Sequence, residues 1–308
     1  MRTTRPPVPP APCATNVCAV VVAYFPDEGF EARLQTILPQ VARLVVVDNT
    51  PDVVSLSSDM VAAWGGQIHC IANHANKGVA AALNQGLEYA LQQGYPWLLT
   101  LDQDTQCYPD MVAILGDVYQ VCRPKPAVIG SNYLDPRSNK PKVPLQGSAC
   151  IDQKTVITSG TMVNTKVALL IGKFREDYFI DQVDHEFCLR VRANDHRVVI
   201  SRKPVMDHSV GAAGGVRLPL LGVLPNHPPL RKYYIARNSV ATVAKYWRSE
   251  PGWCLIRSMR LLLGLLLMAT LEEQRVAKVR AFAAGIMDGV RGSMGPCCRD
   301  WPNRPRKR

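Results

Sequence analysis

The stretch WLLTLDQD, residues 97–104, decides the fold because it joins an apolar run of strand length to two carboxylates, Asp102 and Asp104. Upstream of it, β-branched runs alternate with segments whose apolar residues recur at helical spacing. The elements expected there are strands at 17–25, 43–49 and 67–73 and a helix at 78–94. Near-continuous apolar strands that alternate with helices predict an α/β fold with a mostly parallel sheet flanked by helices.

The two carboxylates stand where such a sheet binds its ligands, at the carboxyl ends of the strands. Asp48 ends an earlier strand at the same edge. Side chains at i and i+2 leaving a strand point to the same side, so Asp102 and Asp104 can hold a hard cation, Mg²⁺ or Mn²⁺. Such a cation would bridge to a diphosphate and offset the charge that develops on it as a leaving group. A solvated turn held by Asx hydrogen bonds is the alternative.

Composition limits the kind of protein that this chain can be. Its 308 residues are 47% hydrophobic and 20% charged, enough to bury one large core and a smaller appendage. The net charge of +11 favours an anionic partner, which could be nucleic acid, a membrane face or a phosphorylated small molecule. Ten cysteines at irregular positions, without a CxxC pair, predict reduced thiols in a cytosolic protein and not a disulfide scaffold or a zinc site. Residues 1–15 are expected to be a flexible tail.

Three phosphate-handling classes lack their motifs here. The turn after the first strand, AYFPDEGFEA at 23–32, has none of the glycines of a dinucleotide-binding domain. The chain contains no P-loop sequence. The aspartate-nucleophile phosphatases need threonine or valine two places after the second aspartate, where this chain has Gln106.

A set of motifs in a fixed order identifies a family. In order they are VVVAYF, VVVDNT, NKGVAAALNQGLEYA, LLTLDQD, SGTMVN, FIDQVDHEFCLRVR, DHSVG and YYIARNSV. Over about residues 16–245 they resemble an inverting glycosyltransferase of family 2 with the GT-A fold, and most of all bacterial rhamnosyltransferases that use dTDP-L-rhamnose. The resemblance implies a nucleotide-diphospho-sugar domain at 16–245, followed at 246–308 by a basic, helical C-terminal region.

The resemblance also implies which residues bind the donor. Asp48 would accept a hydrogen bond from the nucleotide base, although an aspartate capping a turn is the alternative. Asn76, Lys77 and Gly78 would present a helix N-terminus to the nucleotide, as an ordinary helix start also could. The remaining implied contacts are Asp102 to the ribose or nucleotide, Asp104 to the metal, His208 to the metal or the diphosphate, and Arg237 to the diphosphate. Structural roles for His208 and Arg237 remain open.

Inversion by a single displacement requires a base that takes the proton of the attacking hydroxyl. The acidic pair that such enzymes carry before a CLR-like run falls on Val183 and Asp184. Asp184 therefore inherits the base role, with Asp181 in reserve and Glu186 near enough in sequence to share it. An acidic helix N-terminus favoured by the helix dipole would explain all three without catalysis.

Two further segments are expected to shape the site. Ser159, Gly160 and Thr161 resemble the small-residue turn beneath an acceptor pocket, with a tight structural turn as the alternative. The glycines at 211, 214 and 215 would let a loop close over the donor and exclude water.

The C-terminal region is apolar and basic. Its uninterrupted apolar core, Leu261 to Leu271, has 11 residues, whereas a spanning helix needs about 20. With Arg257 and Arg260 just before this core, a helix that lies in the cytoplasmic membrane interface is expected. A buried packing helix, or the helix of a homodimer, is the alternative. The tail RPRKR, 304–308, would suit an anionic lipid surface.

The predicted function is therefore transfer of L-rhamnose from dTDP-L-rhamnose to a hydroxyl of a saccharide or lipid-linked saccharide in bacterial cell-surface polysaccharide synthesis. The enzyme would work in the cytoplasm, peripherally on the inner membrane. Another dTDP- or UDP-sugar donor is the first alternative, and a non-catalytic basic binding protein is the second. Nucleic acid is not expected as a partner, because the basic residues do not cluster with aromatic ones.

Overall fold

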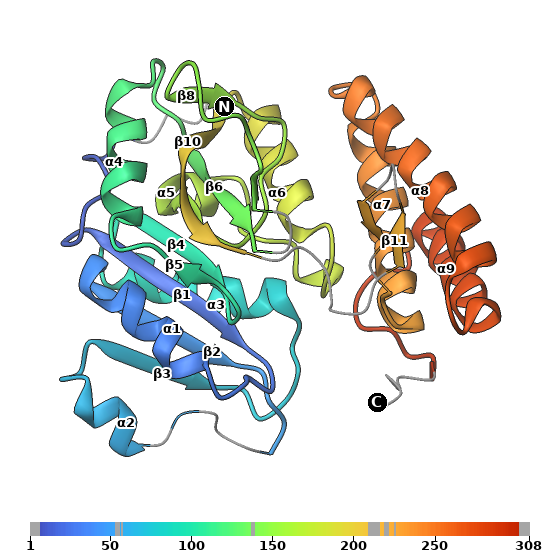
Figure 1. The fold of residues 1–308 in the computed structure, drawn as a ribbon, viewed down its shortest axis with the longest axis horizontal. Coiled ribbons are helices and arrows are strands. Elements are labelled where there is room, and N and C mark those ends of the chain that lie inside the picture. Colours follow the sequence, from blue (N-terminus) through green and yellow to red (C-terminus); the bar gives the residue numbers. More distant parts are fainter. Residues whose placement is uncertain are drawn as a thin grey trace. The chain divides into compact units, whose positions relative to one another are not determined.

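The structure, a computed structural model, describes residues 7–52, 56, 58–136, 139–208, 216–218, 222–224 and 226–301. It divides into two compact units, each of which is described by itself. The sheet unit comprises Met1–Arg175 and Phe187–His208, and the helical unit comprises Glu176–Glu186 and Ser209–Arg308 (Figure 1).

The sheet unit is built on a ten-stranded sheet whose main path runs β3-β2-β1-β4-β9-β6-β10-β5. Its strands are β1 (Val17–Ala23), β2 (Arg43–Asp48), β3 (Ile68–Ala72), β4 (Trp97–Asp102), β5 (Gln106–Cys107), β6 (Val128–Asp135), β7 (Lys140–Pro141), β8 (Cys150–Asp152), β9 (Thr161–Asn164) and β10 (Val198–Asp207). Strands β1 to β4 are mutually parallel, which confirms the sequence prediction. Beyond them the sheet is mixed, because β9 is antiparallel to both β4 and β6.

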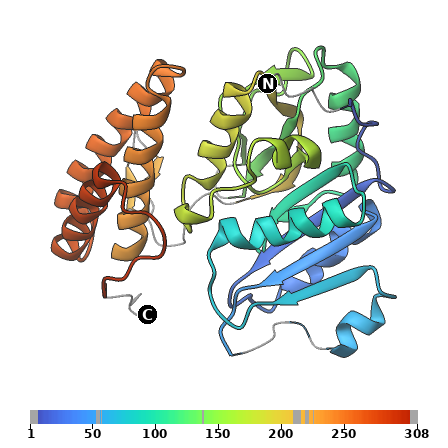
Figure 2. The same cartoon turned by 180° about the vertical axis from the view of Figure 1, so that it is seen from behind.

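Helices cover both faces of this sheet. They are α1 (Phe30–Ile37), α2 (Ser58–Ala63), α3 (Val79–Gln92), α4 (Met111–Val121), α5 (Thr165–Leu170), the short η1 (Leu38–Gln40) and most of α6 (Val183–Ala193). The alternate residues Val17, Ala19 and Val21 of β1 share one core with the buried side chains of α1 and α4. Helix α1 lies in front of the sheet in Figure 1, and α3 lies in front of it in Figure 2, from behind. The predicted α/β fold is thus confirmed.

The N-terminal arm, residues 7–16, differs from the flexible tail that the sequence predicts. The indole N–H of Trp97 donates to the Pro10 carbonyl at 2.8 Å, and the Tyr119 hydroxyl donates to the Pro9 carbonyl at 2.9 Å. Pro12 is buried. Over its described residues the arm is therefore part of the sheet unit, because the carbonyls of Pro9 and Pro10 accept from two buried aromatic side chains.

The expectation that all cysteines are reduced thiols is wrong for one pair. Cys122, at the end of α4, forms a disulfide with Cys150 of β8, 28 residues further along the chain. The irregular spacing of the cysteines in the sequence does not indicate this pair, because it is the fold that brings the two residues together. The other eight cysteines are free thiols.

The helical unit consists of α7 (Pro229–Tyr246), α8 (Pro251–Leu271), α9 (Arg275–Arg291), the hairpin of β11 (Val216–Leu218) and β12 (Gly222–Leu224), and η2 (Glu176–Tyr178). Helix α7 packs against α9 at very short range. A Cβ atom at Gly285 would stand 2.3 Å from the Tyr233 carbonyl oxygen, and one at Gly289 would stand 2.7 Å from that of Arg237. Because α7 packs with α9 and α8, the units divide at 208/209 and not at the predicted 245/246.

Helix α8 is longer than its uninterrupted apolar core suggested. It has 21 residues and, within the described part of the chain, is the one helix that is long and apolar enough to cross a bilayer. Leu261, Leu265 and Met268 pack into a core with α7 and α9, whereas only 11% of its most apolar window is buried. One face of α8 thus holds the helical unit together and the rest is exposed.

Candidate active site

Asp102, Asp104 and His208 converge at one edge of the sheet. Asp102 ends β4, Asp104 follows it by two residues, and His208 follows the last residue of β10. Nε2 of His208 lies 4.0 Å from a carboxylate oxygen of Asp102, and Nδ1 lies 3.9 Å from one of Asp104. One ligand atom from each residue lies within 4.8 Å of the others. The structure thus brings His208 to the two carboxylates that the sequence paired.

Neighbouring side chains hold this cluster in place. The Asp102 backbone N–H donates to the Ser159 hydroxyl at 3.2 Å, and that hydroxyl is hydrogen-bonded to Thr105. Thr105 also lies 3.5 Å from Nδ1 of His208, and the ring of Tyr133 meets the imidazole edge-on. The His208 side chain is only 9% exposed, whereas that of Asp104 is 58% exposed. The cluster is thus anchored on the histidine side and open on the carboxylate side.

The donor set fits a divalent cation. Two carboxylates and a neutral imidazole offer oxygen and nitrogen ligands that suit Mg²⁺ or Mn²⁺. The three ligand atoms lie within 4.8 Å of one another, and the exposure of Asp104 leaves room for oxygens of another molecule. The bonds from Ser159 and Thr105 fix the turn that carries the carboxylates, as outer partners of metal ligands do.

Ser159 and Gly160 form a tight turn beside the two carboxylates, and a place beneath an acceptor pocket stays a prediction. Ser159 supports the Asp102–Thr105 turn. Gly160 has a φ of 73°, and a Cβ there would lie 2.6 Å from the sulfur of Met206. The tight structural turn that the sequence left open as the alternative is therefore present, and its purpose is to support the carboxylates. Sequence reasoning missed this role, because nothing in SGT marks which strand end it contacts.

Asp48 lies at the end of β2, where its Oδ1 accepts from the Thr50 backbone N–H at 2.9 Å. It is 4% exposed. The turn-capping alternative is thus observed, while the contact to a nucleotide base stays a prediction. Beside it, the exposed aromatics Tyr24 and Phe25 follow β1, and Phe25 donates its backbone N–H to the Thr50 hydroxyl at 3.0 Å.

The segment Asn76, Lys77 and Gly78 begins α3. The Asn76 side chain accepts from the Gly78 N–H at 3.0 Å, so this amide is used within the turn and is not an open donor. Lys77 is exposed.

On the other side of β1, the side chain of Gln103 bonds both the N–H and the carbonyl of Tyr24. Gln103, the residue between Asp102 and Asp104, thus ties the turn that carries these carboxylates to the end of β1, a link that the sequence did not indicate.

The three acidic residues of the predicted base region lie in the helical unit and differ in their surroundings. Glu186 is fully buried and accepts from Lys245 Nζ and the Tyr246 hydroxyl, both at 2.8 Å. Asp181 has a φ of 64° and forms an ion pair with Arg231 at 3.2 Å. Burial raises the pKa of the Asp181 carboxyl, against the opposing effect of Arg231.

Asp184 stands at the start of α6 and is half-buried. Its carboxylate accepts from the N–H of the next residue, His185, at 2.8 Å. The charge of Arg257 acts on both Asp181 and Asp184, and burial lowers the pKa of Arg257 to about 10. Of the three acids, Glu186 joins α6 to α7 and Asp181 is paired with arginine. The base role of Asp184 stays a prediction.

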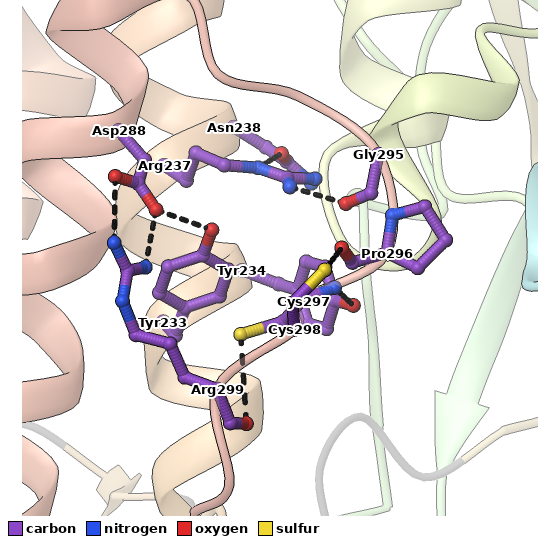
Figure 3. A network of polar contacts seen from close by, with 10 residues as sticks. All are labelled: Tyr233, Tyr234, Arg237, Asn238, Asp288, Gly295, Pro296, Cys297, Cys298 and Arg299. Atoms are coloured by element: carbon purple, nitrogen blue, oxygen red, sulfur yellow. Dashed lines mark hydrogen bonds and ion pairs between the residues drawn. The ribbon is translucent and has the colours of Figure 1, made fainter.

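Arg237 lies inside the helical unit, 1% exposed. Its guanidinium donates to the carbonyls of Asp177, Tyr178 and Gly295 and to the side chain of Asn238. Figure 3 shows how the chain after α9 crosses α7, where Arg299 pairs with Asp288. In this structure Arg237 therefore holds η2 and the C-terminal segment to α7, and we do not include it in the proposed site.

Some predicted features lie outside the described residues. They are the glycine-rich loop at 209–215 and the basic tail at 304–308.

Comparison with known proteins gives this site a family. The sequence model described as Glycosyl transferase family 2 matches residues 18–168, which run from β1 into α5 and include both carboxylates. Residues 18–168 thus form a glycosyltransferase family 2 domain. Among curated relatives of this chain, the dTDP-rhamnosyl transferase RfbF of Shigella flexneri is 28% identical over 298 residues, 91% of this chain and 97% of the relative.

Solved structures show the same fold. Residues 1–349 of S. aureus TarS match with a TM-score of 0.61 at 12% identity, over 89% of this chain and 81% of that one. GalNAc-T7 with UDP, GalNAc and Mn²⁺ matches with a TM-score of 0.56 at 10% identity, over 90% of this chain and 56% of that one. At these identities the likeness concerns the fold alone, and it confirms the GT-A fold of this chain.

Proposed function

We propose that this chain is an inverting rhamnosyltransferase that moves L-rhamnose from dTDP-L-rhamnose to a hydroxyl of a saccharide or lipid-linked acceptor. The observation that carries the proposal is the cluster of Asp102, Asp104 and His208 at the strand ends of a chain that carries a family 2 domain. The likeness to a dTDP-rhamnosyl transferase over nearly its whole length supports the choice of donor.

The residues divide the work between donor and acceptor. Asp104 and His208 would hold Mg²⁺ or Mn²⁺, with Asp102 beside them toward the nucleotide. When bound, the cation offsets the negative charge on the diphosphate. Asp48 would accept a hydrogen bond from the base, and the helix start at Asn76 to Gly78 would border the nucleotide. Asp184 would accept the proton of the acceptor hydroxyl, with Asp181 in reserve.

A second donor class has one observation in its favour. TarS, which shares this fold, was solved in complex with UDP-GlcNAc. The alternative is therefore a family 2 transferase that uses another dTDP- or UDP-linked sugar. It would keep the same cation cluster, because the diphosphate is common to both classes of donor.

We further propose that the enzyme works on the cytoplasmic face of the inner membrane, in the synthesis of cell-surface polysaccharide. Two observations support this location. Helix α8 has an exposed apolar face, and the whole chain carries a net charge of +11, which favours an anionic membrane surface. Arg257 and Arg260 lie within this helix, and Arg257 donates to the Ser239 hydroxyl of α7. These contacts favour a helix lying in the membrane interface over one that spans the bilayer.

The test is turnover of a panel of nucleotide sugars by the purified protein with Mn²⁺ or Mg²⁺, followed by released nucleoside diphosphate. We expect slow hydrolysis of dTDP-L-rhamnose and of no other donor in the panel. This hydrolysis should stop when the metal is chelated. Consumption of a different donor would keep the family 2 activity and overturn the rhamnose assignment. A protein that neither turns over nor binds any donor would contradict the proposal as a whole.

A further inference from the structure

The pairing between β1 and β4 ends where the candidate cation cluster begins. Val22 and Asp102 form the last pair of this parallel register. The chain then turns, because the Thr105 N–H donates to the Asp102 carbonyl at 3.2 Å. We call residues 102–105 the carboxylate turn. Strand β1 ends one residue after Val22, so Tyr24 lies beyond the ladder that the two strands form.

The side chain of Gln103 continues this ladder where the backbone has turned away. Its Oε1 accepts from the Tyr24 N–H at 2.6 Å, and its Nε2 donates to the Tyr24 carbonyl at 3.2 Å. A primary amide offers the same kinds of donor and acceptor as a peptide group. The pairing with β1 can therefore go on while the backbone at residue 103 bends to bring Asp104 toward His208.

The main chain of Gln103 has an anchor of its own. Its carbonyl accepts from Arg33 Nε of α1 at 2.7 Å. Arg33 also forms an ion pair with Asp27, in the connection between β1 and α1, and its side chain is only 16% exposed. Side chain and backbone of Gln103 thus both hold the carboxylate turn to the residues that follow β1.

The same connection is held to the edge that carries Asp48. Phe25 has a φ of 47°, a left-handed conformation that costs free energy for a residue with a side chain. Its N–H donates to the Thr50 hydroxyl at 3.0 Å, and the Thr50 N–H donates to Asp48 at 2.9 Å. A series of hydrogen bonds therefore runs from the carboxylate turn through Gln103 and Tyr24 to Asp48.

We propose that Gln103 is a positioning residue that fixes the spacing between the two ends of the donor site, Asp48 and Asp104. The inference rests on the donor contacts proposed for these two residues. A nucleoside diphosphate with its base at Asp48 and its diphosphate at the cation spans both ends, so its second contact forms within the complex. That contact adds most to affinity when the spacing of the ends matches the length of the ligand. Gln103 keeps this spacing through Tyr24 and the carboxylate turn.

The experiment is calorimetric titration of the full chain with three probes. Thymidine carries the base without a phosphate, Mn²⁺ occupies the cation end alone, and dTDP with Mn²⁺ spans both ends. The informative variant is Gln103→Met, whose side chain has a similar length but lacks the amide donor and acceptor. We expect its affinity for thymidine and for Mn²⁺ to stay within about twofold of the wild type, whereas its affinity for dTDP with Mn²⁺ falls about tenfold or more.

Two further variants check the reason for this loss. Gln106→Met makes the same exchange at an exposed glutamine that follows the carboxylate turn, and it should bind all three probes as the wild type does. Thr50→Val removes the hydroxyl that accepts from Phe25, and its loss should again be confined to dTDP with Mn²⁺. The positioning role would be overturned by unchanged dTDP affinity in Gln103→Met, by an equal loss for all three probes, or by the same loss in Gln106→Met.

The outcomes separate this role from the proposed function. If the wild type needs Mn²⁺ to bind dTDP tightly and Gln103→Met binds it as well, the positioning role falls and the donor site stands. If the wild type binds neither Mn²⁺ nor dTDP, the proposed donor site falls and the positioning role falls with it.

Discussion

At the scale of single residues, three acidic residues of the helical unit, Asp181, Asp184 and Glu186, show how environment separates similar side chains. Glu186 is satisfied by a lysine and a tyrosine inside the unit, and Asp181 is held by an arginine. Within the described residues, the hydrogen bond found for the Asp184 carboxylate comes from the backbone N–H of His185. The sequence offered all three as candidates for the base, and the proposal of Asp184 follows from this difference in contacts.

The base assignment predicts a divided result for two isosteric substitutions. Asp184→Asn should lower kcat by about 10²–10⁴-fold at an unchanged midpoint of thermal unfolding, because it removes only the proton acceptor. Glu186→Gln should lower the free energy of unfolding by about 1–3 kcal/mol while the folded enzyme keeps its kcat, because it weakens a buried anchor. The reverse pattern, an active Asp184→Asn and an inactive but stable Glu186→Gln, would remove Asp184 from the base role.

His227 predicts a pH dependence of stability. Burial, with the nearby charges of Arg231, Lys232 and Lys278, lowers its pKa from the ordinary 6.5 to about 3 in the folded chain. Below pH 6.5 the unfolded chain therefore takes up a proton that the folded chain refuses. Its contribution to stability is present above pH 6.5 and is lost as the pH falls, by up to about 1.4 kcal/mol per pH unit.

Denaturant unfolding of the wild type and His227→Gln between pH 7 and pH 4 checks this. The variant should show a shallower decline in the free energy of unfolding. Parallel curves for the two proteins would mean that His227 titrates normally.

At the scale of elements, the sequence predicted what is local and missed what is long-range. Periodicity located β1 to β4 and α3 to within a few residues, because buried parallel strands are continuous apolar runs. It did not show that β9 inserts antiparallel between β4 and β6, since strand order depends on pairing across the chain. For the same reason it missed the disulfide and the support that Ser159 gives to the carboxylate turn.

The disulfide between α4 and β8 predicts a redox-dependent stability. The two cysteines are 28 residues apart, and loop-closure entropy for a loop of that length gives about 3.6 kcal/mol. Cys122→Ser should lower the free energy of unfolding by about that amount under oxidising conditions. Excess dithiothreitol should lower the free energy of unfolding of the wild type to that of Cys122→Ser. If reductant lowers both proteins equally, the stabilisation has another source.

The exposed face of α8 predicts that single leucines control membrane binding. Leu262→Lys should reduce binding to neutral vesicles, because a charge replaces a side chain that is 69% exposed on that face. Val290→Lys on α9, where valine is 74% exposed, serves as the control and should bind as the wild type does. Equal binding of all three proteins, measured by flotation, would place the membrane contact elsewhere.

At the scale of the whole molecule, the two units carry different groups of the proposed site residues. The sheet unit contains the proposed donor-binding residues at the strand ends. The helical unit carries the proposed base and the exposed apolar helix. The boundary between them could not be predicted from composition, because α7 reads as a continuation of the transferase motifs and yet packs with α8 and α9.

The central claim is that Asp102, Asp104 and His208 hold a divalent cation that binds the diphosphate of a dTDP-sugar. The most direct measurement is calorimetric titration of dTDP-L-rhamnose into the wild type and Asp104→Asn, each with Mn²⁺ and with chelator. The account predicts tight binding only for the wild type with Mn²⁺, and binding at least about tenfold weaker in the other three cases. The claim would be contradicted if the wild type bound dTDP-L-rhamnose equally well with and without Mn²⁺. It would also be contradicted if Asp104→Asn bound the donor as tightly as the wild type in the presence of Mn²⁺.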